Sequence, residues 1–253
     1  MERNIAKRVL ESFCTFPISE SCGVLNAFAA LPGAVWHSDQ KLESFVYVPG
    51  VRKDRVLLVA HADTVWNTHY QFEKYSQTLL RKSAEGKTVY FGKDSSCGIG
   101  ADDRAGCAML WMLRKSGHSL LILDGEEHGQ IGANHIRLNY PDIYDELNGH
   151  SYAIQFDRRN DREYKVYDLP VSEEFLDFIE EKTGYKNAGT NARTDIVALC
   201  RDICGVNLSV GYHNEHKPDE YLVFEEWFAT LEIAERLLAE PQRRFPLEKR
   251  EFF

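Results

Sequence analysis

Four short apolar runs of this chain end directly in front of side chains that can bind a metal ion. The side chains that follow these runs are His61, the pair Glu126 and Glu127, Asp157, and the pair His213 and His216. Apolar runs of this length are typical of buried strands in a parallel or mixed sheet. Ligands of open α/β sheets gather beyond the carboxyl ends of such strands. The pattern therefore predicts that one end of one sheet collects histidines and carboxylates, which is the outline of a metal site.

Helical patterns alternate with these strands along the chain. This alternation predicts the α/β class, as a three-layer α/β/α domain with a central mixed, mostly parallel sheet. Helices are expected over residues 4–14, 20–31, 105–114, 132–138, 173–183, 193–203 and 224–240. An antiparallel strand pair is expected within 31–36 and 44–50, and a hairpin over 77–82 and 87–92. The absence of repeats and linkers predicts a single domain over residues 1–253.

Composition narrows the class of partner. The formal net charge of −9 argues against nucleic acid or an anionic membrane, because both require a basic face. No segment has the length and apolar character of a membrane span or a signal peptide. The six cysteines follow no disulfide framework, so reduced thiols and a cytoplasmic location are expected. A small neutral or mixed-charge substrate is the partner easiest to accommodate.

His61 and Asp63 form a pair that is typical of metal sites. Residues two positions apart on an extended segment project to the same side, so Asp63 can accept the second ring N–H of His61. Such a carboxylate fixes the tautomer of a metal-binding histidine. Taken alone, a histidine after a buried strand is also explained as a satisfied core residue.

Asp102 and Asp103 lie in a glycine-flanked turn at 98–106. A carboxylate in such a turn can offer one oxygen to each of two metal ions, and this bridging position is expected for Asp102. Asp103 is also a good N-cap for the helix that follows, and both interpretations can hold together.

Glu126 and Glu127 follow the most apolar strand of the chain. Adjacent carboxylates cannot both point the same way, so one is expected to bind metal while the other accepts a proton from water. A solvated turn is the alternative for this dipeptide alone. Asp157 and His216 complete the expected ligand set, with His213 as the rival of His216.

Together these motifs resemble a known family. The matching segments are residues 56–66, 98–106, 123–133, 155–157 and 211–221. In their order and residue types they are similar to the co-catalytic dizinc exopeptidases, the superfamily of bacterial leucyl-type aminopeptidases, peptidase T and glutamate carboxypeptidases. The intervals between the motifs are short, so the resemblance is to the compact form without an inserted lid or dimerisation domain.

The resemblance implies two Zn²⁺ ions, although Co²⁺ or Mn²⁺ can occupy such sites. In the family pattern His61 and Asp157 complete one metal site, Glu127 and His216 complete the other, and Asp102 bridges the two. A cis peptide bond after the bridging aspartate is a further family feature, here between Asp102 and Asp103.

The implied activity is that of a zinc-dependent metallopeptidase, an aminopeptidase or another exopeptidase that acts on small peptides. Glu126 corresponds to the general base, and Asp63 to the partner of His61. A deacylase or amidase of N-acyl amino acids would use the same site on another small amide. A non-catalytic zinc-binding protein is the alternative from another class.

The residues that would recognise the substrate are left open by the sequence. Arg158 or Arg159 can clamp a substrate carboxylate, or form a structural salt bridge to Asp161 or Glu163. Asp195 or Glu215 can instead receive a substrate α-amine. The expected substrate-binding residues are therefore Arg158, Asp195 and His213.

Overall fold

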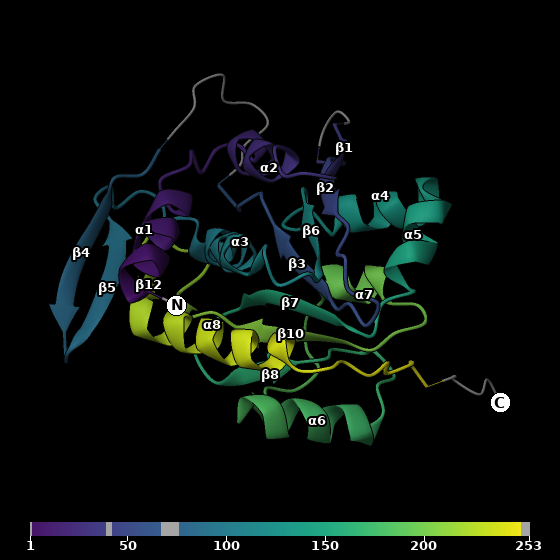
Figure 1. The fold of residues 1–253 in the computed structure, drawn as a ribbon. Coiled ribbons are helices and arrows are strands. Elements are labelled where there is room, and N and C mark those ends of the chain that lie inside the picture. The colour runs from purple at the N-terminus through teal and green to yellow at the C-terminus, as the bar shows by residue number, and fades with distance from the viewer. Residues whose placement is uncertain (1, 39–41, 67–75, 249–253) are drawn as a thin grey trace.

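The computed structural model describes residues 2–38, 42–66 and 76–248, which contain two β-sheets and eight helices (Figure 1). The larger sheet has eight strands in the order β1-β2-β6-β3-β7-β10-β8-β9. Their bounds are β1 Val35–His37, β2 Phe45–Val48, β3 Leu57–His61, β6 Ser119–Leu123, β7 Ala153–Arg158, β8 Glu163–Lys165, β9 Lys186–Asn187 and β10 Gly205–Ser209. The central strands β6, β3, β7 and β10 are mutually parallel, whereas β2 and β8 run antiparallel to their central neighbours. The predicted mixed, mostly parallel sheet is confirmed.

The register of the central strands places their carboxyl ends side by side. His61, the last residue of β3, lies opposite Leu123, the last residue of β6. On the other side of β3, Val59 lies opposite Gln155 of β7. Asp157, two residues further along β7, therefore reaches the level of His61. The loops that follow these strands therefore start from the same end of the sheet.

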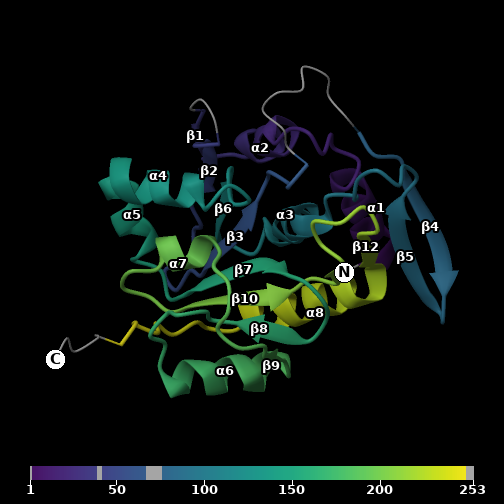
Figure 2. The ribbon, with the colours of Figure 1, turned by 180° about the vertical axis from the view of Figure 1, so that it is seen from behind.

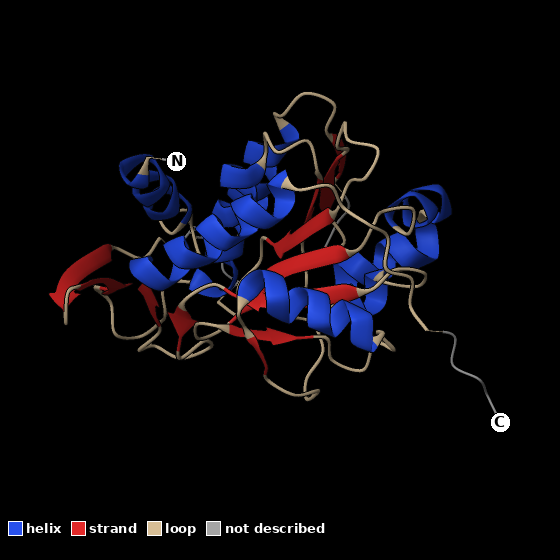
Figure 3. Cartoon of the chain, turned by 60° about the horizontal axis from the view of Figure 1, so that its bottom comes forward, coloured by secondary structure: helices blue, strands red, loops and turns tan. Residues whose placement is uncertain are grey.

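Helices cover both faces of the large sheet (Figure 3). Their bounds are α1 Arg3–Phe13, α2 Cys22–Ala29, α3 Ala101–Leu113, α4 Ile131–Asn139, α5 Pro141–Leu147, α6 Glu173–Thr183, α7 Asp195–Leu199 and α8 Phe224–Ala239. Leu58 and Ala60 of β3 join a hydrophobic core with α1, α2, α3, α6 and α8. The alternate residues Leu57 and Val59 join a second core with α4, α5 and α7, which face the viewer in Figure 2. The three-layer α/β/α architecture is confirmed.

A smaller antiparallel sheet lies at the edge of the molecule, where Figure 1 shows β4 and β5. Its strand order is β11-β12-β5-β4, with bounds β4 Leu79–Ala84, β5 Lys87–Gly92, β11 Tyr212–His213 and β12 Tyr221–Val223. The predicted hairpin is therefore present as β4 and β5. Pairing of Leu222 with Tyr90 fixes the far end of the loop that carries His216.

The predicted helix over 193–203 is too long, because α7 ends at Leu199. The side chain of Asn148 explains the early end. Its amide nitrogen donates to the carbonyl of Leu199, while its oxygen accepts the N–H groups of Arg201 and Asp202. These bonds replace those that a continuing helix would make, so the chain turns toward β10.

Two predicted absences concern membranes and disulfides. Across the described ranges, no helix has both the length and the apolar character required to cross a bilayer. All six cysteines lie within the described residues, and none of them forms a disulfide.

Candidate metal centre

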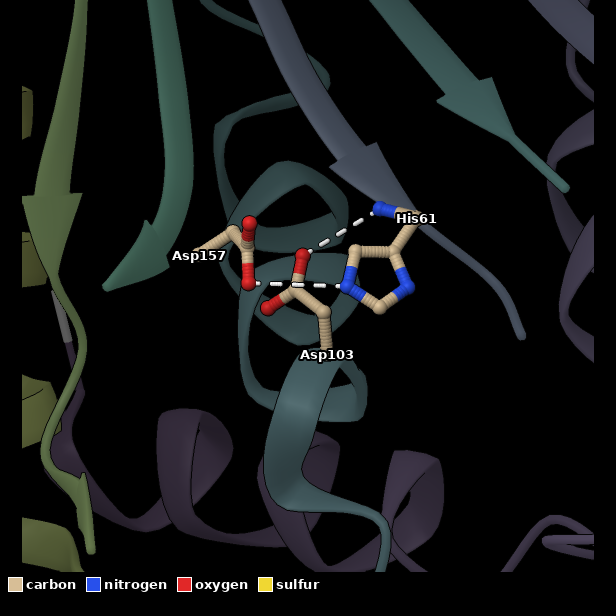
Figure 4. Close-up of side chains that lie close together, drawn as sticks. All are labelled: His61, Asp103 and Asp157. Carbon is tan, nitrogen blue, oxygen red and sulfur yellow. Dashed lines mark hydrogen bonds and ion pairs between the residues drawn. The ribbon is translucent and has the colours of Figure 1, made fainter. Parts of the chain in front are cut away.

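The predicted ligands converge beyond the carboxyl ends of β3 and β7 and at the start of α3. Figure 4 shows His61 and Asp157 at the ends of their strands, with Asp103 on the first turn of α3 between them. The distance from Nε2 of His61 to Oδ1 of Asp157 is 3.5 Å. The peptide bond between Asp102 and Asp103 is cis, as the family resemblance implied.

Asp102 lies between two histidines. Its Oδ1 atom is 3.2 Å from Nε2 of His61, and its Oδ2 atom is 3.0 Å from Nε2 of His216. The same nitrogen of His216 lies 3.0 Å from Oε2 of Glu127. The carboxylate of Asp102 therefore contacts the imidazole rings of both histidines. The ligand atoms of His61, Asp102 and Glu127 all lie within 4.8 Å of one another, a spacing suited to a metal ion.

Asp103 has a different position from its neighbour. Its Oδ2 atom accepts the main-chain N–H of His61 at 3.2 Å, and its Oδ1 atom accepts that of Gly106 at 2.8 Å. The second bond is the helix cap predicted from the sequence. Asp103 also belongs to a metal-compatible group with His61 and Asp157. Because both of its oxygens hold main-chain N–H groups, Asp103 is better suited to positioning β3 against α3 than to bridging.

Asp63 holds the two loops of the site together. The Nδ1 atom of His61 hydrogen-bonds the carbonyl oxygen of Asp63 at 3.1 Å and lies 3.4 Å from its carboxylate. That contact places the proton on Nδ1 and leaves Nε2 free to bind a metal. The carboxylate of Asp63 accepts the main-chain N–H groups of Glu126 at 3.2 Å and Glu127 at 3.1 Å. The histidine partner predicted from the sequence therefore also orients the glutamate pair.

Asp157 is held by residues that the sequence did not single out. The hydroxyl of Tyr212 donates to its Oδ1 atom at 3.1 Å, while Thr194 and Gln155 donate to Oδ2 at 2.9 and 3.0 Å. The side chain of Asn207 also donates to the main-chain carbonyl of Asp157. Of these residues only Gln155 has a recognisable sequence signal, because it is a polar residue within an apolar strand. Nothing in the sequence around Tyr212 and Thr194 indicates that they contact Asp157.

Burial shapes the electrostatics of the glutamate pair. Removal from water raises the pKa of the Glu126 carboxyl well above its usual range, and the nearby carboxylates of Asp157 and Asp195 raise it further. Burial likewise raises the pKa of Glu127. Its side chain is only 5% exposed, and among the described residues its Oε1 atom has no hydrogen-bond partner. Crowded, buried carboxylates of this kind call for a positive charge at the centre of the cluster.

Two of the expected substrate-binding residues are engaged elsewhere. Arg158 forms an ion pair with Glu163 at 2.8 Å, which is one of the two structural alternatives considered for it. His213 pairs with Glu226 at 2.7 Å and stacks on the ring of Tyr221, so the structure does not bring it into the cluster.

Glu215 and Asp195, the two carboxylates expected to be able to bind a substrate amine, differ in their hydrogen-bond and ion-pair partners. Glu215 is paired with Arg159. Asp195 is fully buried, and neither of its carboxylate oxygens has a hydrogen-bond partner within the described part of the chain. Of the two, only Asp195 keeps unsatisfied acceptor atoms near the centre.

Comparison with known proteins shows which solved structures have a similar fold. No family model and no curated protein sequence matches the chain. Aminopeptidase PepT from Bacillus cereus superposes with a TM-score of 0.64 at 13% identity, over 94% of this chain and 98% of that one. A tripeptidase from Staphylococcus aureus gives a TM-score of 0.64 at 12% identity, over 94% and 98% of the two chains. An aminopeptidase from the archaeon Desulfurococcus kamchatkensis gives 0.59 at 13% identity, over 94% and 96%.

These similarities confirm the predicted relationship at the level of the fold. The chain has the α/β fold of solved structures named as aminopeptidases and a tripeptidase, and it shares that fold over nearly its whole length. At such low identity the likeness carries the architecture alone. The activity has to be inferred from the side chains of the site.

Proposed function

We propose that this protein is a hydrolase that uses two bound Zn²⁺ ions to cleave a peptide bond in a small peptide. The observation that carries the proposal is the position of Asp102 between His61 and His216, with one oxygen toward each imidazole at 3.2 and 3.0 Å. A carboxylate placed in this way offers one oxygen to each of two ions, which in two-metal sites lie ~3.5–4 Å apart.

The surrounding donors fit a pair of divalent cations. Under this proposal His61 and Asp157 hold one ion, Glu127 and His216 hold the other, and Asp102 holds both. Imidazole with carboxylate suits Zn²⁺, and Co²⁺ or Mn²⁺ can use the same ligands. The unpartnered Oε1 atom of Glu127 supports this assignment, because a bound cation would satisfy it.

Bound cations of this kind lower the pKa of water and polarise a carbonyl group. Glu126 takes up the proton of the attacking water and then donates it to the leaving amine. Burial raises the pKa of its carboxyl, which suits a group that must hold a proton between these two steps. Asp63 keeps Glu126 in place by accepting its main-chain N–H.

For the substrate we favour a short peptide with a free α-amine. The ion pair between Arg158 and Glu163 weakens the case for a clamp on a substrate carboxylate. Asp195 has unsatisfied acceptor atoms and is the remaining candidate for the amine. The side chain of His216 is 48% exposed, so a small substrate can approach the centre from that side. The names of the solved structures that share the fold point to the same class of substrate.

We further propose that the chain acts as one catalytic domain in a reducing compartment such as the cytoplasm. Support comes from the six cysteines, none of which forms a disulfide. Strands of the small sheet and the large sheet share a hydrophobic core, which includes Leu222 and Leu58 and favours a single unit.

Metal analysis of the purified protein, combined with a peptide panel, tests the proposal. We expect two equivalents of zinc per chain and hydrolysis of dipeptides with a free N-terminus, abolished by a chelator and restored by Zn²⁺. Turnover of N-acyl amino acids alone would assign the amidase activity instead. Two bound zinc ions without turnover of either class would indicate a non-catalytic zinc-binding protein.

A further inference from the structure

Glu220 is a buried carboxylate that connects two loops of the metal centre. It lies at the end of the loop that carries His216, and the residue is only 1% exposed. Its Oε2 atom accepts the main-chain N–H of Gly100 at 2.7 Å, and its Oε1 atom accepts that of Asp102 at 3.1 Å. Both N–H groups belong to the turn that presents the shared carboxylate.

The turn at the start of α3 needs these bonds, because Asp102 and Asp103 have non-helical φ and ψ angles and the cap formed by Asp103 serves only the residues that follow it. The first N–H groups of a helix have no partner within the helix and require an outside acceptor. Gly100, in the N-cap position of α3, has no side chain to supply one, and no side-chain cap bond is formed there. Glu220 provides the missing acceptors from a distant part of the sequence.

The backbone of Gly98 makes room for Glu220. A methyl group at Gly98 would overlap Oε2 of Glu220, and it would lie 2.9 Å from the carbonyl oxygen of Lys217. A side chain at this position would therefore force the two loops apart. The fit shows that the turn before Asp102 and the loop after His216 approach each other closely at this carboxylate.

The loop of His216 is itself held in a fixed shape. Asn214 and His216 both have positive φ angles, of 58° and 62°. The amide of Asn214 donates to Asp219 at 2.9 Å, and the N–H of Glu220 donates to the carbonyl of Lys217 at 3.1 Å. A shift of Glu220 is therefore transmitted to His216, four residues away.

We propose that Glu220 is a positioning residue that fixes the separation between Asp102 and His216, and so sets the zinc affinity of both metal sites. The inference rests on the proposed two-zinc function. Glu220 holds the turn of Asp102 from one side and the loop of His216 from the other. Because Asp102 serves both ions, loss of this link weakens both sites together.

Glu220→Gln tests this role, because the amide keeps the size of the side chain but presents an NH₂ group to a main-chain donor. Zinc dissociation constants are measured by competition with a chromophoric chelator, and folding of the metal-free protein is followed by circular dichroism. We expect both dissociation constants to rise by about tenfold to a hundredfold. Lys217→Gln is the matched control, since it removes an exposed charge from the same loop without touching α3 or the main-chain carbonyl of residue 217, and we expect its zinc affinity to equal that of the wild type.

Gly98→Ala provides a second variant, which retains the Glu220 carboxylate but shifts its position. It should weaken zinc binding in the same direction, which keeps the test available if Glu220→Gln does not fold. A purely structural role would lower the unfolding midpoint of the metal-free protein while leaving both zinc constants at wild-type values, and that result would overturn the inference. Wild-type protein that binds two zinc ions but cleaves no amide overturns only the proposed function. Failure of the wild type to bind zinc overturns both.

Discussion

The carboxylate of Asp63 accepts the main-chain N–H of Glu127 at 3.1 Å. This bond joins the loop after β3 to the loop after β6. The two loops are distant in sequence, but the strands that they follow are neighbours in the sheet. The other carboxylate oxygen accepts the N–H of Glu126 at 3.2 Å. One buried side chain therefore positions a proposed metal ligand and the proposed general base at the same time.

Asp63→Asn should impair both of these functions. The amide nitrogen cannot accept a hydrogen bond, so one of the two N–H groups loses its partner at nearly constant side-chain volume. We expect kcat for dipeptide hydrolysis and zinc affinity each to fall by about tenfold to a hundredfold. Steady-state kinetics and chelator competition measure the two effects. Asp142→Asn, an exposed change on α5, is the control, and wild-type values in Asp63→Asn would remove Asp63 from the mechanism.

Glu126→Gln should separate metal binding from turnover. Glu126 is assigned proton transfer and no metal, so the variant should retain two equivalents of zinc. General acid–base catalysis contributes about 10²- to 10⁴-fold, and we expect kcat to fall by that factor. Metal content by elemental analysis and kcat are measured on the same sample. Substantial activity in the zinc-loaded variant would assign the proton transfer to another group.

Much of the fold and of the site follows from local sequence signals. His61 and Asp157 were expected at the ends of buried strands, and the parallel register brings both to one edge of the sheet. The cap formed by Asp103 on Gly106 is also a local pattern, since the two residues are three positions apart. Signals of this kind depend on periodicity and on neighbours along the chain.

The features that the sequence did not predict depend on contacts between distant residues. Asn148 ends α7 from a position about 50 residues earlier. Glu220 accepts the main-chain N–H of Gly100 from 120 residues later. Tyr212, in β11, supports Asp157 of β7 across a separation of 55 residues. None of these side chains carries a local mark of its role, so only the folded chain identifies them.

His213→Ala should leave the metal centre intact. The ring pairs with Glu226 at 2.7 Å and stacks on Tyr221 at 4.7 Å between centroids, so its interactions support the small sheet. We expect zinc stoichiometry and affinity to match the wild type, while the free energy of unfolding falls by about 1 kcal/mol. Urea unfolding and zinc titration provide the two values. A lost equivalent of zinc would restore His213 as the rival of His216.

Gly106→Ala should destabilise the fold at the contact between α3 and β7. A methyl group at this position would overlap the carbonyl oxygen of Phe156 and the carboxylate of Asp103. Relief of such overlap requires a shift of the helix, which costs about 1–3 kcal/mol and sometimes more. Urea unfolding of the metal-free protein measures the loss. Gly149→Ala is the control because its nearest contact would be 3.1 Å away, and equal stability of the two variants would contradict the close packing.

His150 predicts how stability depends on pH away from the metal centre. Burial, reinforced by the nearby Arg55 guanidinium, lowers its pKa from the usual ~6.5 to about 4. Ser119 and Arg55 both hydrogen-bond its Nε2 atom, at 2.7 and 3.2 Å, which favours the neutral ring. The unfolded chain takes up a proton below pH ~6.5 while the folded chain does not. This group therefore leaves stability unchanged above pH ~6.5 and lowers it as the pH falls toward 4, by an amount on the order of 3 kcal/mol.

Urea unfolding with a chelator present keeps metal loss out of the measurement. His150→Gln removes the titrating ring, so the wild type should lose stability more steeply than the variant between pH 6.5 and 4. Parallel pH profiles of the two proteins would show that His150 is protonated in the fold.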